Sequence, residues 1–193
     1  MIMTKHSDTA PDGKNARLAE KYIKRGESEK YCKLLGDVLE GLDIKRRAVE
    51  RTGIASFVSE LEQVVLSSFE YGEISKIPCL VGTDRKKGSA VSSNYCVTHL
   101  YFGSDRIFLY SYLFSVIGRY AREEVAEVCY RDIVCARAVR ETRPIGESAE
   151  GKGAVVAATA KLFIGLASGE LCIPCGADGA ELNRAVQLLS ARR

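Results

Sequence analysis

The sequence lacks any apolar run long enough to span a bilayer, and residues 1–15 lack a hydrophobic stretch that could serve as a signal peptide. We therefore expect a cytoplasmic protein. The seven cysteines are an odd, scattered set and lie mostly inside apolar segments, where cysteine behaves as a small hydrophobic residue. This use of cysteine also favours a reducing compartment.

Recognisable catalytic and metal-binding motifs are scarce as well. A zinc site needs three or four ligands, and the chain offers one C-x-x-C pair and only two histidines, His6 and His99, so we expect no bound metal. There is no Gly-rich phosphate loop and no Ser/His/Asp set in a known context, so we expect neither an enzyme nor a cofactor. A net charge of +3 is too small to predict nucleic-acid binding.

What the chain does contain is enough apolar residues for a core, since 46% of its 193 residues are hydrophobic. Residues 1–15 are polar and predict a flexible tail. Apolar residues then recur at helical spacing, which predicts a helical segment over residues 16–72, mostly helix from Ala16 to Phe69. Residues 1–75 carry 12 basic and 13 acidic side chains, whereas residues 76–193 carry 16 basic and 12 acidic ones. The excess of positive charge is therefore assigned to residues 76–193.

Short apolar runs separated by turn residues follow from residue 76 onwards. They predict about seven strands, at Lys76–Gly82, Tyr95–Phe102, Arg106–Val116, Val125–Tyr130, Ile133–Val139, Val155–Leu166 and Glu170–Cys175. Pro78 places the first strand at a sheet edge, because proline cannot donate a ladder hydrogen bond. Gly103-Ser104-Asp105 predicts a hairpin turn between the second and third strands. Asp178, with Glu181 three residues later, predicts the N-terminal cap of a final amphipathic helix that ends at Ala191.

Seven antiparallel strands followed by one helix is the element order of the pleckstrin homology (PH) superfold. Three strings, Phe69-Glu70-Tyr71-Gly72-Glu73, the hairpin Val97 to Tyr110 and Val128-Cys129-Tyr130-Arg131-Asp132-Ile133, resemble bacterial PH-like domains. The resemblance covers about residues 70–193. It implies an α+β fold in which residues 73–193 form a PH-like domain, a seven-stranded, bent antiparallel sheet or barrel capped by the C-terminal helix.

The PH resemblance draws attention to the basic residues Arg85, Lys86 and Lys87, between the first two predicted strands. In lipid-binding PH domains this loop binds inositol phosphates through charge-assisted hydrogen bonds. The family's motif continues with basic residues on the second strand, whereas Tyr95–Phe102 offers only His99. Arg85–Lys87 is therefore a candidate anion or lipid site, set against the alternative of a solvated turn.

Cys172-Ile173-Pro174-Cys175 resembles the C-x-P-C site of thioredoxin-like proteins. A helix N-terminus after such a motif would lower a thiol pKa and make the thiolate reactive. Thioredoxin-like folds place the motif early, after a βαβ start, whereas here it lies at the end of a chain of antiparallel strands. The alternative is two cysteines on the last strand, with Pro174 ending it.

Three functional classes follow from these residues. The favoured one is a non-catalytic PH-like adaptor that binds another protein or itself and needs no cofactor. The second is a peripheral module that binds anionic lipid through Arg85, Lys86 and Lys87. The third is a thiol-redox protein that uses Cys172 and Cys175.

Overall fold

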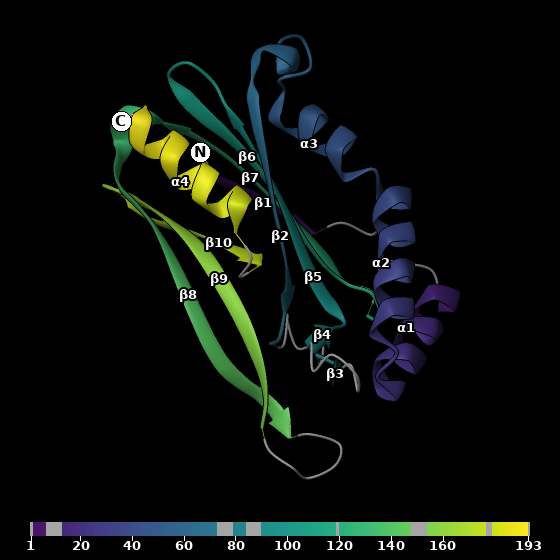
Figure 1. The fold of residues 1–193 in the computed structure, drawn as a ribbon. Helices are drawn as coiled ribbons and strands as arrows, with labels where there is room; N and C mark the ends of the chain where they lie inside the picture. The colour runs from purple at the N-terminus through teal and green to yellow at the C-terminus, as the bar shows by residue number, and fades with distance from the viewer. Residues whose placement is uncertain are drawn as a thin grey trace.

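The computed structural model describes residues 2–6, 13–72, 79–83, 90–118, 120–147, 154–176 and 179–192. Over these residues N-terminal helices, antiparallel sheets and a C-terminal helix follow one another, so the predicted α+β class is confirmed (Figure 1). No helix within these ranges is long and apolar enough to cross a membrane.

A five-stranded antiparallel sheet forms the centre of the fold, in the order β1-β7-β6-β5-β2. Its strands are β1 (Ile2–His6), β2 (Glu62–Glu70), β5 (Asn94–Phe102), β6 (Arg106–Ser115) and β7 (Ala121–Cys129). The middle strands are rich in β-branched and aromatic residues, which pack well on a pleated surface. Nearly every residue of β5 is buried, because both faces of the sheet are covered. The predicted β5–β6 hairpin is confirmed.

A separate three-stranded antiparallel sheet has the order β10-β9-β8. Its strands are β8 (Ile133–Glu147), β9 (Ala154–Leu166) and β10 (Gly169–Gly176). The 3₁₀ turn η2 (Tyr130–Asp132) carries the chain from β7 in the first sheet to β8 in the second. The predicted strands of this region are confirmed. The predicted barrel is not closed, because the strands of the described residues divide into separate sheets.

The first predicted strand, Lys76–Gly82, is only partly covered, since residues 73–78 lie outside the described residues. At its end, Val81–Thr83 forms the short strand β3, which pairs with β4 (Ala90–Ser92) as a two-stranded sheet. Gly82 is required there by close approach. A Cβ at this position would lie 2.4 Å from the carbonyl oxygen of Ile23 on the neighbouring helix.

The sheet begins earlier than the sequence predicted. The expected helix up to Phe69 is wrong for Glu62–Glu70, which is the strand β2 and pairs with β5. Apolar residues at helical spacing suggested a helix, but Val64 and Leu66 are buried on one face while Val65 is 39% exposed on the other. This alternation is the period of a strand.

The predicted tail over residues 1–15 also differs from the structure. Ile2–His6 pairs with β7 as the edge strand β1, and the first helix begins at Gly13. A polar composition did not prevent pairing here, because an edge strand is held by backbone hydrogen bonds to one neighbour.

The N-terminal helices lie along one side of the five-stranded sheet, and the C-terminal helix lies on the other side, where it contacts both β2 and β8 (Figure 1). They are α1 (Gly13–Arg25), α2 (Ser28–Leu42), α3 (Ile44–Thr52), the 3₁₀ turn η1 (Val58–Glu60) and the C-terminal α4 (Ala180–Ala191). The predicted final helix is confirmed over these residues, whereas its predicted cap, Asp178, lies outside the described residues.

Two apolar clusters lie on opposite faces of the five-stranded sheet. One joins the first three helices to the sheet and includes Ile23, Tyr31, Leu35, Ile54, Tyr101, Tyr110 and Phe114. The other joins the two sheets to α4 and includes Val64, Leu66, Leu100, Leu162, Ile164, Leu182 and Leu189. The central sheet is therefore the middle layer of the molecule.

Candidate binding site at the β5–β6 turn

A hollow of about 670 Å³ opens beside the turn that joins β5 to β6, and a second of about 350 Å³ shares this turn. Both are lined by Ser104, Asp105, Arg106 and Arg192. We call the two together the turn hollow. Its remaining lining residues are Phe57, Glu60, Leu61, Phe102, Gly103, Phe108 and Glu127 in the larger part, and Cys129, Tyr130 and Arg131 in the smaller.

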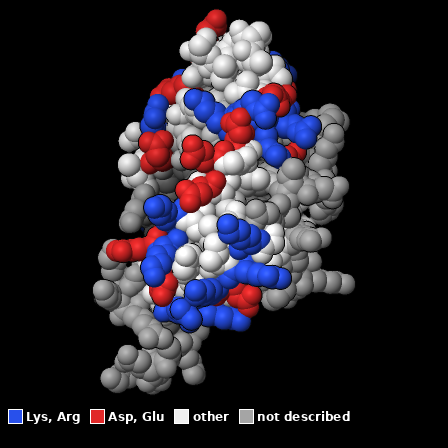
Figure 2. All heavy atoms as spheres, turned by 90° about the vertical axis from the view of Figure 1, so that its right-hand side faces the viewer, with Lys and Arg blue, Asp and Glu red and all other residues white. Residues whose placement is uncertain are grey.

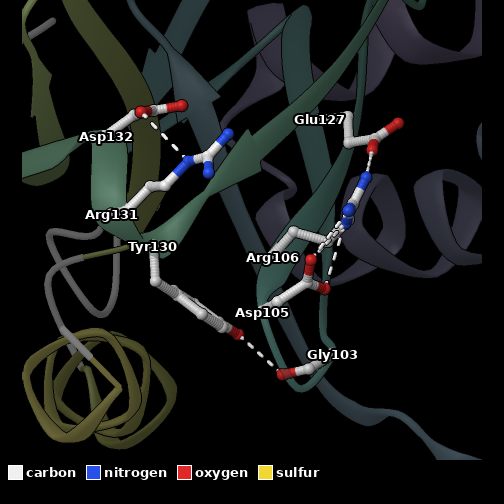
Figure 3. Close-up of polar contacts among 7 residues, drawn as sticks. All are labelled: Gly103, Asp105, Arg106, Glu127, Tyr130, Arg131 and Asp132. Carbon is white, nitrogen blue, oxygen red and sulfur yellow. Dashed lines mark hydrogen bonds and ion pairs between the residues drawn. The ribbon is translucent and has the colours of Figure 1, made fainter.

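Hydrogen bonds to the backbone hold the turn in place, and Figure 3 shows the one from the Tyr130 side chain to Gly103. The Gly103 amide donates to the Arg106 carbonyl at 2.9 Å, which closes the hairpin. The Tyr130 amide donates to the Asp105 carbonyl at 3.0 Å, and the Tyr130 hydroxyl donates to the Gly103 carbonyl at 3.1 Å. Tyr130 lies in η2, so the junction between the two sheets fixes the turn from behind. The hollow is therefore preformed.

Arg106 points across the turn between two carboxylates (Figure 3). Its Nε and Nη2 donate to Asp105 Oδ1 at 3.0 Å and Oδ2 at 2.7 Å, and Nη1 donates to Glu127 on β7. The hydrogen bond from Arg106 lowers the pKa of Asp105, so this carboxylate is charged at neutral pH. The guanidinium is thus neutralised and oriented, and offers planar hydrogen-bonding edges rather than free charge.

Arg192, just after α4, closes the other side of the hollow. It donates to the Gly103 carbonyl at 3.2 Å and to the Tyr130 hydroxyl at 3.3 Å, and pairs with Glu62 on β2 at 3.1 Å. Its guanidinium lies 5.6 Å from the Phe102 ring centroid, a cation–π contact. Arg192 therefore joins the end of the chain to β2 and to the turn. Burial raises the pKa of Tyr130, which keeps its hydroxyl a donor.

An aromatic wall completes the larger part of the hollow. Phe57, before η1, packs against Phe108 on β6 with ring centroids 5.9 Å apart and planes tilted by 58°. Both rings and Leu61 are only partly buried. A concave surface that combines aromatic side chains with arginines has the composition found at the centre of protein interfaces.

Cys172 and Cys175 lie on β10, which pairs with β9 without a register shift. The expectation that Pro174 ends this strand is wrong, because β10 continues to Gly176. Successive residues of a strand rise about 3.3 Å, so the two Cα atoms are about 10 Å apart. A disulfide requires less than about 7 Å. Burial raises the pKa of Cys175 to about 11 and also raises that of Cys172, the opposite of what a reactive thiolate needs. This geometry argues against redox chemistry at the pair.

Arg85, Lys86 and Lys87 lie outside the described residues. The segment that carries them leaves β3 at Thr83 and returns at Ala90 of β4, and these two residues face each other in the small sheet. Its starting and ending points are thus remote from the β5–β6 turn, which lies at the far end of β5.

The turn hollow was missed at the level of sequence. Its lining comes from segments between Phe57 and Arg192, and only Gly103-Ser104-Asp105 was recognised, as a turn. Nothing local in the sequence connects Arg192 with that turn.

No protein-family model, no curated protein and no solved structure matches the chain. Across the residues that the structure describes, no group of three or more metal-ligating side chains comes together.

Proposed function

We propose that the chain is a non-catalytic PH-like module that binds a protein partner at the turn hollow. The order of elements supports the PH-like part. Seven strands, β2 and β5 to β10, precede the helix α4, with β3 and β4 as an additional hairpin between the first and second of them. The proposed sheet therefore begins at Glu62 rather than at the strand expected from residue 76.

The observation that carries the binding function is the composition of the turn hollow. Phe57, Leu61 and Phe108 give it an apolar wall, and the arginines at its rim are held by carboxylates, so their positions are set before a partner arrives. Preorganised side chains lose little conformational freedom on binding, which favours affinity. An apolar or aromatic side chain of the partner would enter the hollow, and the rim would bond to its backbone.

Affinity capture with the full chain tests this proposal. A fragment that starts at residue 73 is unsuitable because it lacks β2, which pairs with β5. The double variant Phe57→Ala/Phe108→Ala removes both rings of the wall without changing charge. Truncating a central interface residue costs about 2 kcal/mol or more, so capture of the partner should fall at least about 30-fold.

Val156→Ala is the matched control, since Val156 is an apolar residue 47% exposed on the other sheet. It should capture the partner as the wild type does. Sedimentation of the purified chain over a range of concentrations shows whether the partner is a second copy. Equal capture by the double variant, with its fold verified by circular dichroism, would contradict the proposed site.

A further inference from the structure

Basic side chains gather on the face of the molecule formed by α1 and α2. Figure 2 shows them over the lower part of the helical side, where these two helices lie. Residues 13–33, which cover α1 and the start of α2, carry seven basic and three acidic side chains, a net charge of +4, while the rest of α2 carries Asp37 and Glu40 and no basic residue. We call the exposed basic residues of this segment the basic helix face: Lys14, Arg17, Lys21, Lys24, Arg25, Lys30 and Lys33.

The packing of α1 explains why these charges share one surface. Ala19 and Ile23 are fully buried, and Leu18 and Tyr22 pack against the same apolar cluster. An amphipathic helix that buries one stripe must turn its remaining residues to solvent. On α1 the exposed charged residues are five basic ones and Glu20.

Few acidic residues compensate these charges. Lys24 pairs with Glu20 at 2.6 Å and Lys30 with Glu27 at 3.0 Å, both on the surface, where such pairs are screened and weak. Arg17, Lys21, Arg25 and Lys33 have no ion pair with any described residue. These four basic side chains are therefore available to a partner, and of them Lys21 and Arg25 also interact electrostatically with Glu27.

The composition of the face distinguishes among possible partners. The large apolar side chains that are exposed in the described residues, Val65, Val134 and Val156, all lie outside α1 and α2. Protein interfaces are depleted in lysine and need apolar or aromatic anchors. The aromatic side chain on α1, Tyr22, is partly buried in the helical cluster, with the Lys30 ammonium 5.9 Å from its ring centroid. A sequence pI of about 8.4 is below that expected of a nucleic-acid-binding domain. An anionic membrane surface, in contrast, is bound by clusters of four to eight basic residues without insertion.

We propose that the basic helix face binds the surface of membranes rich in anionic phospholipids, with α1 and the first turns of α2 lying on the head groups and no side chain entering the hydrocarbon. The site is distinct from the turn hollow and does not depend on the function proposed for it. Each basic residue near such a surface strengthens binding about fivefold, so the unpaired ones dominate the affinity.

Co-sedimentation of the full chain with vesicles tests the proposal. Vesicles of phosphatidylcholine alone are compared with vesicles that contain phosphatidylserine as a second lipid. The variant Arg17→Gln/Lys21→Gln/Arg25→Gln removes three exposed charges. The matched control, Arg137→Gln/Arg140→Gln/Lys161→Gln, removes the same number from β8 and β9, on the other side of the molecule (Figure 1).

We expect binding to the anionic vesicles only, a loss of about 100-fold in the first variant and a change of less than about threefold in the control. Binding should also weaken steeply as ionic strength rises. An equal loss in both variants would overturn the proposal, because net charge and not the helix face would then decide binding. The absence of binding to anionic vesicles would also overturn it. Polyglutamate serves as a probe for an acidic protein partner: if it binds, and only the first variant loses that binding, while vesicles do not bind, the face recognises acidic protein and not membrane.

Discussion

Glu123 on β7 joins the helical layer to the central sheet, and removing its partners should destabilise the fold. The side chain is 3% exposed and pairs with Arg47 at 3.4 Å and Arg51 at 3.1 Å, both on α3. The Arg47 guanidinium also lies 5.8 Å from the centroid of the Tyr112 ring. Two cations from the helix thus neutralise one buried carboxylate of the sheet.

The double variant Arg47→Met/Arg51→Met leaves this carboxylate buried with neither arginine. Breaking a buried pair costs about 3–5 kcal/mol, and because Arg51 is about half exposed we expect the lower end, about 3 kcal/mol. Each 1 kcal/mol lowers the Tm of a chain of this size by about 2–4 °C, so Tm should fall by about 6–12 °C. Urea unfolding followed by circular dichroism measures the loss in free energy.

Two controls make this measurement decisive. Arg46→Met removes an arginine of the same helix whose pairs with Asp43 and Glu50 are on the surface, and should cost less than about 0.5 kcal/mol. Adding Glu123→Met to the double variant should restore most of the lost stability, because a buried ion network can be replaced by apolar side chains. A double variant no less stable than Arg46→Met, or no recovery on removing Glu123, would refute the reasoning.

Three further predictions concern other parts of the chain. Burial, with a smaller contribution from Lys45, lowers the pKa of His99 to about 4. As the pH falls, the unfolded chain therefore binds a proton at His99 before the folded chain does. The free energy of unfolding should fall by at most about 3 kcal/mol between about pH 6.5 and pH 4. Denaturant unfolding at several pH values should show that the free energy of unfolding of His99→Gln depends less on pH than that of the wild type. An equal pH dependence would contradict this. Replacing Arg85, Lys86 and Lys87 with alanine should leave folding and partner binding nearly unchanged. Any vesicle binding by these three residues should contribute at most about 3 kcal/mol, should not depend on which phosphoinositide is present, and should be lost at high salt. Tight, head-group-selective binding abolished by those substitutions would show the opposite. Thiol titration with elemental analysis should find Cys172 and Cys175 reduced and free of metal. The buried Cys175 should react only after unfolding. Stoichiometric zinc would contradict the expectation of metal-free thiols.

The strands from residue 94 onwards were predictable because their signals are local. Gly103-Ser104-Asp105 and the apolar runs beside it define the β5–β6 hairpin within one short stretch, and the turn before Gly169 does so for β9 and β10. The strand β2 was not predictable in this way. Both of its faces carry apolar residues, so the spacing of Val65 and Phe69 fits a helix as well as a strand.

Long-range contacts determined what the sequence did not reveal about the site. Arg192 reaches Gly103 and Glu62, and Phe57 reaches Phe108, across separations that no local pattern encodes. Charge counting failed for a related reason. Residues 1–75 sum to −1 because the total also counts acidic residues outside the basic helix face, such as Glu62, which in the structure pairs with Arg184 and Arg192.

The two proposed surfaces lie at opposite ends of β5. α1 contacts β3, and β4, the partner of β3, ends two residues before β5 begins, whereas the turn hollow lies beyond Phe102 at the other end of β5. Nine extended residues span about 30 Å, so substitutions at the two surfaces share no contact and should act additively. Phe57→Ala/Phe108→Ala should therefore leave vesicle binding unchanged, and neutralising the basic helix face should leave partner capture unchanged. Loss of both activities from either variant would mean that one surface performs both tasks, which would contradict the separation of the two surfaces.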